Sequence, residues 1–232
     1  MKPHAREEQR ILEVCCASVE CVIAADAGGG DRIELCENLD VGGLTPSEDL
    51  LKVAKAGTSL QVFVLIRCRA GDFRFTGKEV SRMVAQIENV RHLGADGIVC
   101  GALTDEGEID EEATSRFITA AGPLPFTFHR AFDALHDQSA GLALLRELGA
   151  ERILSSAGLH EACEDPQRLQ ELVIHAGGRP GILACGGIRS TNIGALAAMR
   201  EIREFHSAAS SGGDGVDVDE VRAMKDAIIR EY

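Results

Sequence analysis

The chain has 232 residues, of which 45% are hydrophobic, and it carries a formal charge of −13 at neutral pH. This length suits one barrel or two small domains with a full buried core. The negative charge argues against non-specific binding to nucleic acid or to an anionic membrane surface, because the dominant electrostatic interaction would be repulsive.

Residues 1–10 are charged and polar and contain no apolar segment of the signal-peptide type. No apolar run in the chain approaches the roughly 18 residues of a membrane span. We therefore expect a flexible N-terminal segment over 1–10, a folded domain over 11–232, and a cytoplasmic protein. The eight cysteines include no Cys-x-x-Cys pair, which argues against zinc-ribbon and thioredoxin-type motifs.

Strand-like and helix-like patterns alternate along the whole chain, with no linker between them. We predict strands at 12–15, 33–36, 61–66, 94–101, 125–129, 151–155, 181–184 and 202–206, and helices at 18–30, 46–57, 76–93, 109–121, 138–148, 165–176, 190–199 and 216–232.

Eight strands that each precede a helix predict a single α/β domain, a closed (β/α)8 TIM barrel. A doubly wound open sheet is the alternative, but its G-x-G-x-x-G motif does not follow the first strand. The three glycines at 28–30 follow a helix instead, which indicates a helix stop rather than a phosphate loop.

The first two strands share the pattern Glu-x-Cys, in Glu13-Val14-Cys15 and in Glu34-Leu35-Cys36. Because side chains alternate along a strand, each strand places its glutamate and cysteine on one face. Two thiols on adjacent strands can hold a soft ion such as Cu(I), so Cys15 and Cys36 are candidate metal ligands. The competing interpretation is that these cysteines only fill the core.

In a barrel the strand ends converge on one mouth, where catalytic residues gather. One interpretation is an acid–base site, with a glutamate as base, a histidine as acid and two arginines as a clamp for an anion. The other is an internal salt-bridge network that only positions the strands. The candidate catalytic residues are Glu13, Glu34, Arg67, His129, Arg130 and His206.

Glycine and serine residues follow the last two strands. Gly186 and Gly187 come after the seventh strand, and Ser207 ends the eighth. TIM barrels bind phosphate through backbone amides at this position, so the three residues are candidates for binding a phosphorylated ligand. Tight strand-to-helix turns would use glycine in the same way.

Several stretches together resemble the CutC family, across nearly the whole chain from Leu12 to Ser207. They are Leu12-Glu13-Val14-Cys15, Asp31-Arg32-Ile33-Glu34-Leu35-Cys36, Gly42-Gly43-Leu44-Thr45-Pro46-Ser47, Phe128-His129-Arg130-Ala131-Phe132-Asp133 and Glu204-Phe205-His206-Ser207. The resemblance implies a cytoplasmic, usually homo-oligomeric TIM barrel associated with copper homeostasis. It also implies Cu(I) binding at Cys15 and Cys36.

The chain departs from the pattern of that family at Cys68, Ala157 and Cys185, which replace a proline and two glycines. The two thiols either add soft ligands or narrow the expected phosphate pocket. Three functions stay open at this point: copper handling, an enzyme acting on a small anionic or phosphorylated metabolite, and a scaffold with a vestigial mouth. The residues alone decide neither for nor against an enzyme.

Overall fold

The computed structural model describes residues 10–212 and 215–230. The segment 1–9, most of the stretch expected to be flexible, lies outside the described residues. Arg10 is described and buried, and its guanidinium donates hydrogen bonds to the carbonyl oxygens of Met199 and Ile228. These contacts tie the start of the described chain to helix α8 (Val218–Arg230).

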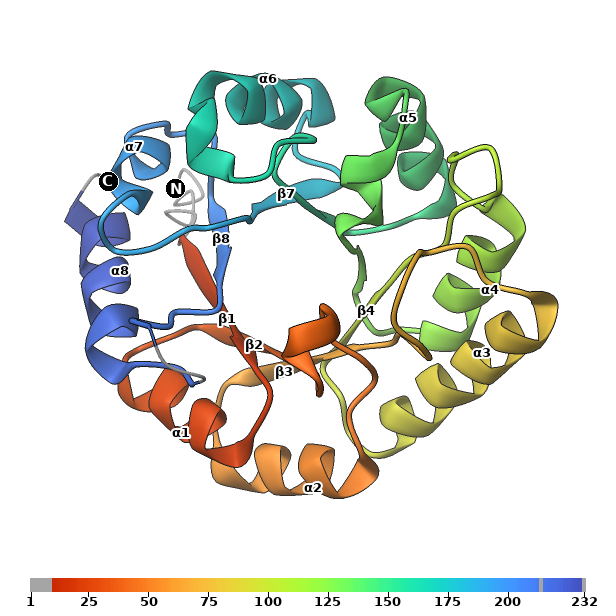
Figure 1. The fold of residues 1–232 in the computed structure, drawn as a ribbon, viewed down its shortest axis with the longest axis horizontal. Helices are drawn as coiled ribbons and strands as arrows, with labels where there is room; N and C mark the ends of the chain where they lie inside the picture. The colour runs from red at the N-terminus through yellow and green to blue at the C-terminus, as the bar shows by residue number, and fades with distance from the viewer. Residues whose placement is uncertain (1–9, 213–214, 231–232) are drawn as a thin grey trace, which may run out of the picture.

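Eight parallel strands close into one barrel, each pairing with its neighbours in chain order and β8 pairing with β1. Figure 1 shows the strands inside a ring of helices. This topology confirms the predicted TIM barrel, and the alternative of a doubly wound open sheet is wrong. The strands are β1 (Ile11–Cys16), β2 (Arg32–Leu35), β3 (Gln61–Leu65), β4 (Gly97–Cys100), β5 (Phe126–Phe128), β6 (Arg152–Ser155), β7 (Gly181–Ala184) and β8 (Glu204–Ser207).

The helices follow the strands as predicted, and side chains of Ser18, Ser47 and Thr76 cap the first three of them by accepting backbone N–H groups. None of the described helices is long and apolar enough to cross a membrane. Besides α8 the helices are α1 (Val19–Ala27), α2 (Glu48–Gly57), α3 (Gly77–His92), α4 (Glu111–Ala121), α5 (Gln138–Leu148), α6 (Pro166–Ala176) and α7 (Ile193–Ala197).

Helix α7 is shorter than the predicted helix over 190–199. The amide and hydroxyl of Ser190 both donate to the Glu220 carboxylate on α8, and the Asn192 side chain accepts the amide of Arg189. These side-chain contacts hold the first residues in a turn. The structure also contains three short 3₁₀ segments that were not predicted, η1 (Leu39–Val41), η2 (Arg130–Ala134) and η3 (Ala162–Glu164).

The two faces of the strands have different surroundings. Outward-facing residues such as Leu12, Val14 and Ile33 pack with the helices in one large apolar cluster. The lumen holds smaller apolar clusters around Phe63 and Leu183, together with buried charged residues. A lumen that carries buried charge is unusual, because branched apolar residues normally fill it, and it directs attention to the mouth above.

Candidate functional site at the barrel mouth

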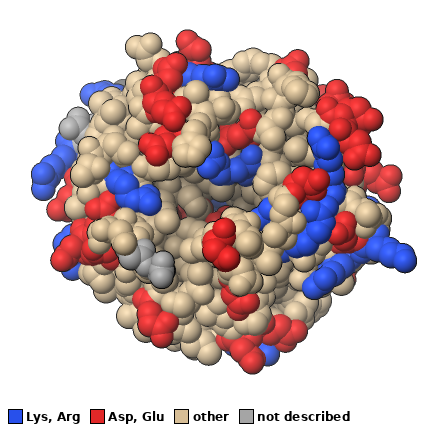
Figure 2. All heavy atoms as spheres, viewed as in Figure 1, with Lys and Arg blue, Asp and Glu red and all other residues tan. Residues whose placement is uncertain are grey.

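The carboxyl ends of the strands surround a pocket of about 290 Å³. Figure 2 views this face of the molecule and shows acidic and basic side chains around its middle. The pocket is lined by ten of the eleven predicted site residues, all except Glu13: Cys15, Glu34, Cys36, Arg67, His129, Arg130, Gly186, Gly187, His206 and Ser207.

The two predicted metal ligands meet in this pocket. The Sγ atoms of Cys15 and Cys36 lie 3.7 Å apart, although the strand register pairs Cys15 with Glu34. The hydrogen bond to Cys36, followed by burial and the charge of Glu34, raises the pKa of the Cys15 thiol well above its usual value. Cys15 is therefore protonated at neutral pH, and a metal ion has to displace its proton.

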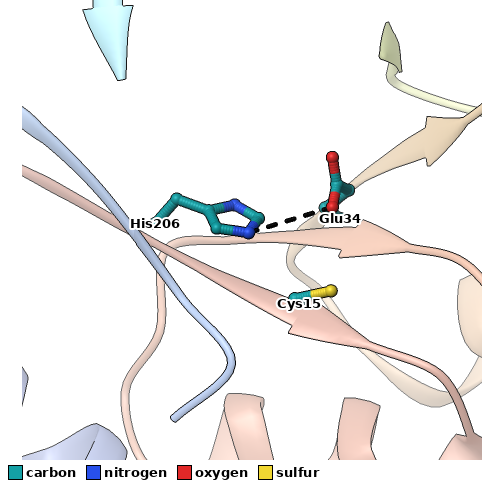
Figure 3. A group of neighbouring side chains, drawn as sticks. All are labelled: Cys15, Glu34 and His206. Carbon is teal, nitrogen blue, oxygen red and sulfur yellow. Dashed lines mark ion pairs between the residues drawn. The ribbon is translucent and has the colours of Figure 1, made fainter. Parts of the chain in front are cut away.

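Cys15 also belongs to a second cluster, with Glu34 of β2 and His206 of β8 (Figure 3). One ligand atom from each of the three residues lies within 4.8 Å of the others, and His206 Nε2 is 3.9 Å from Glu34 Oε2. Burial raises the pKa of the Glu34 carboxyl. Burial lowers the pKa of His206, but the hydrogen bond to Glu13 and the charges of Glu34 and Glu13 outweigh burial and leave this pKa raised. Thiol, carboxyl and imidazole thus share one side of the pocket.

Glu13 lies below the pocket, inside the lumen. Its carboxylate accepts hydrogen bonds from Arg32 Nε and, at 2.7 Å, from His206 Nδ1. Burial alone would raise the pKa of this carboxyl, but Arg32 and then His206 lower it to about 2. Arg32 also pairs with Glu204, which pairs with Arg152. Glu13 is therefore ionised and fully paired, as in the internal network that the sequence analysis considered.

Of the predicted histidines and arginines, His206 alone contacts the two glutamates. The main partner of Glu13 is Arg32, which was not among the predicted site residues. The signal was present, because a period of two places Arg32 on the same strand face as Glu34. The prediction looked for partners at strand ends, whereas these charges pair in the middle of the lumen.

Arg67 holds loops together. Its Nη1 donates to the carbonyl oxygens of Val41 and Gly43 at 2.9 and 3.1 Å, and its Nη2 donates to that of Gly71 at 2.6 Å. These bonds fasten the loop after β2 to the loop after β3 beside the pocket. These three bonds occupy the Nη atoms of Arg67, whereas its buried Nε has no partner among the described residues. Arg67 lines the pocket, and its role in an anion clamp stays a prediction.

Arg130 and His129 follow β5. The guanidinium of Arg130 is paired, and the His129 ring is buried. Arg130 pairs with Asp133 at 3.0 Å and donates to Ser156 Oγ at 2.9 Å. The buried His129 accepts the Ala131 amide at Nδ1, and burial lowers its pKa to about 3, so the ring is neutral. A proton therefore stays on Nε2, which has no partner among the described residues.

The loops after β7 and β8 also line the pocket. Gly186 and Gly187 adopt φ angles of 94° and 63°, so both positions require glycine-like freedom. Ser207 Oγ donates to the Ile188 carbonyl oxygen and accepts from the Ala209 amide and from Arg189 Nη1. Its hydroxyl is therefore used in joining the two loops, while Arg189, which the prediction omitted, adds a cation to the pocket lining.

The three departures from the family pattern have different surroundings. Cys185 is buried in the pocket lining, and burial raises the pKa of its thiol well above the usual value. Cys68 packs against the outer core and is not in the pocket lining. Ala157 adopts φ of 58°, a conformation that favours glycine. Cys185 therefore contributes a thiol to the pocket lining, whereas Cys68 adds none.

The comparisons agree with this architecture. The chain superposes on the crystal structure of a CutC protein from Streptococcus agalactiae with a TM-score of 0.81 and 30% identity, covering 86% of this chain and 99% of that one. It also superposes on a thiamine phosphate pyrophosphorylase from Pyrococcus furiosus with a TM-score of 0.64 over 97% and 98% of the two chains. At 15% identity, this second likeness concerns the fold alone.

A human copper homeostasis protein cutC homolog is 43% identical over 204 residues, which cover 88% of this chain and 75% of the human protein. A CutC family protein from Chromobacterium violaceum is 36% identical and covers 94% and 98% of the two chains. The model of the CutC family matches residues 10–211. By the extent of these matches, this chain belongs to the CutC family.

Proposed function

We propose that this protein binds Cu(I) through Cys15 and Cys36 and serves in copper homeostasis. The separation of 3.7 Å between the two Sγ atoms carries the proposal, because one ion can contact both sulfur atoms. Thiolates favour Cu(I) over hard cations such as Mg²⁺ and Ca²⁺. The copper homeostasis proteins among the relatives support the same function.

An anaerobic competition for Cu(I) against a chromophoric chelator tests the proposal. We expect Cys15→Ala with Cys36→Ala to lower the Cu(I) affinity by at least about 100-fold, since outer-shell changes alone cost 10- to 100-fold. The matched control is Cys16→Ala with Cys21→Ala, which removes two other buried cysteines that lie in the outer core. Equal affinity in the two double variants would refute the proposal.

We place this activity in the cytoplasm, because all eight cysteines are unbridged and Cu(I) binding needs reduced thiols. We also propose a homo-oligomer. Ile23 on α1 and Val53 on α2 are 54% and 49% exposed, and these two helices are neighbours. Light scattering after size exclusion tests the oligomer, and a mass of one chain at micromolar concentration would contradict it.

A second candidate function is an enzyme acting on a small anionic or phosphorylated metabolite. The amides of Gly186 and Gly187 make no hydrogen bond within the described residues, and Arg189 lies beside them in the pocket lining. Glu34 and His206 would then exchange a proton with the substrate. Thermal shift with inorganic phosphate and sugar phosphates tests this function. A shift in the wild type that disappears in Arg189→Gln would support it, and no shift would count against it.

A further inference from the structure

The spacing of the two thiols indicates how many ligands a bound ion needs. With a metal–thiolate bond of about 2.3 Å, a linear arrangement separates the sulfur atoms by about 4.6 Å and an angle of 120° by about 4.0 Å. The Sγ atoms of Cys15 and Cys36 lie 3.7 Å apart. This distance fits a bent arrangement, which leaves a coordination position for a third ligand.

Two side chains are candidates for that position, because they lie close to the thiol of Cys15. Glu34 and His206 each bring a ligand atom within 4.8 Å of Cys15 Sγ. Figure 3 shows both residues above Cys15, from the strands on either side of β1. Imidazole suits copper, whereas carboxylate suits harder cations. The chemistry of the donors therefore favours His206.

The orientation of His206 is fixed by residues in the lumen. Its Nδ1 bonds to Glu13 Oε1 at 2.7 Å, and the other carboxylate oxygen of Glu13 accepts from Arg32, which also pairs with Glu204. His206 Nε2 is 3.9 Å from the nearest Glu34 oxygen, beyond hydrogen-bond distance. A ring nitrogen that has no hydrogen bond, on an imidazole whose other nitrogen is held by a carboxylate, is typical of a metal ligand.

We propose that His206 Nε2 is the third ligand of a Cu(I) site with Cys15 and Cys36, and that Glu13, held by Arg32, is the positioning residue for its imidazole. The inference rests on the proposed binding of Cu(I) by the two thiols and adds a ligand to it. Coordination leaves the ion as Cu(I) and releases to solvent the thiol protons and any proton on His206 Nε2, while Nδ1 keeps its proton toward Glu13. Glu34 stays outside the set of ligands.

X-ray absorption at the copper edge, on the full chain loaded anaerobically with one equivalent of Cu(I), tests the ligand. We expect three-coordinate copper, with two sulfur scatterers and the multiple scattering of one imidazole. His206→Gln, which keeps a polar side chain beside Glu13, should lose the imidazole signal and keep both sulfur atoms. Glu34→Gln should leave the spectrum unchanged. His136→Gln, outside the mouth pocket, is the matched histidine control.

Glu13→Gln tests the positioning. The variant keeps a hydrogen-bonding side chain but loses the charge that holds His206 Nδ1–H, so we expect the Cu(I) affinity of the folded protein to fall by about 10- to 100-fold. A purely structural role would lower stability and leave this affinity unchanged. Circular dichroism identifies the folded fraction. In His206→Ala, added free imidazole should restore the three-coordinate spectrum.

The outcomes separate the two proposals. A wild-type spectrum with two sulfur scatterers and no imidazole, together with loss of copper in Cys15→Ala with Cys36→Ala, would overturn the inference and leave the proposed function standing. A change in Glu34→Gln but not in His206→Gln would assign the third position to Glu34 and also overturn it. Failure of the wild type to retain Cu(I) would overturn both.

Discussion

Two regions of the mouth pocket, the cluster around Cys15 and the loops after β7 and β8, differ in how much of their hydrogen-bonding capacity the protein itself uses. On the side of β1, β2 and β8, the thiols of Cys15 and Cys36 contact each other and His206 Nε2 has no partner within hydrogen-bond distance. In the loops after β7 and β8, Ser207 donates to the Ile188 carbonyl oxygen, and Arg189 donates to the carbonyl oxygens of Ser210 and Ile188. Unused donors beside a pocket therefore point to ligand binding more clearly than the presence of polar residues does.

The largest expected effect comes from removing the buried ion pairs of Arg32, which lie in the lumen below the thiols. Arg32→Gln leaves Glu13 and Glu204 without their shared cation inside the lumen, so we expect unfolding free energy to fall by about 3 to 5 kcal/mol. Urea denaturation measures it. The exposed pair of Arg222 and Asp219 supplies the control, since Arg222→Gln should cost less than about 1 kcal/mol. Similar losses in both variants would contradict a lumen network.

The buried Nε2 of His129, which follows β5, also has no partner among the described residues. The folded protein holds this pKa at about 3, below the unfolded value of about 6.5. Between these values the unfolded chain binds the proton and the folded chain does not, so the stability contribution is present above pH 6.5 and is lost as the pH falls.

We therefore expect the wild type to lose about 2 to 3 kcal/mol more than His129→Gln between pH 7 and pH 4.5. Urea titrations of both proteins at the two pH values measure the difference. Parallel losses would mean that His129 becomes protonated in the folded protein, and that its side of the pocket is open to water.

A variant at Arg67 tests whether this cation has a structural role or binds a ligand. Arg67→Gln removes buried hydrogen bonds to three loop carbonyls, so we expect a loss of about 1 to 3 kcal/mol of stability with little change in Cu(I) affinity. Arg74→Gln, at an exposed position in the same loop, is the matched control and should stay within about 0.5 kcal/mol. A thermal shift with phosphate that depends on Arg67 would instead restore its predicted role as a clamp.

The smallest effect is expected at the glycine turn. Gly187→Ala places a Cβ at a φ of 63° and 2.6 Å from the Glu161 side chain, so we expect a loss of about 1 to 2 kcal/mol. Gly194→Ala, where a Cβ meets open space within α7, should stabilise by up to about 1 kcal/mol. If Gly187→Ala also lowered Cu(I) affinity, the distinction between a ligand-binding cluster around Cys15 and structural loops after β7 and β8 would be contradicted.

Part of this site was predictable from the sequence. Alternation along a strand placed Glu13 with Cys15 and Glu34 with Cys36, and parallel strand order brought Cys15, Glu34 and Cys36 to one mouth, with Glu13 below it. Their partners were harder to predict. Arg32 and Glu204 lie 172 residues apart and meet only because β8 closes the barrel against β1.

The sequence by itself determined the order of strands and helices, the barrel and the residues that reach its mouth, because periodicity and strand ends are local properties. Tertiary structure alone decided which of those residues are free to bind. Arg67 and Ser207 carry suitable groups, but the loops that fold over them use those groups. Hydrogen-bonding capacity is a property of a residue, whereas its availability depends on every neighbour that closure of the barrel brings within reach.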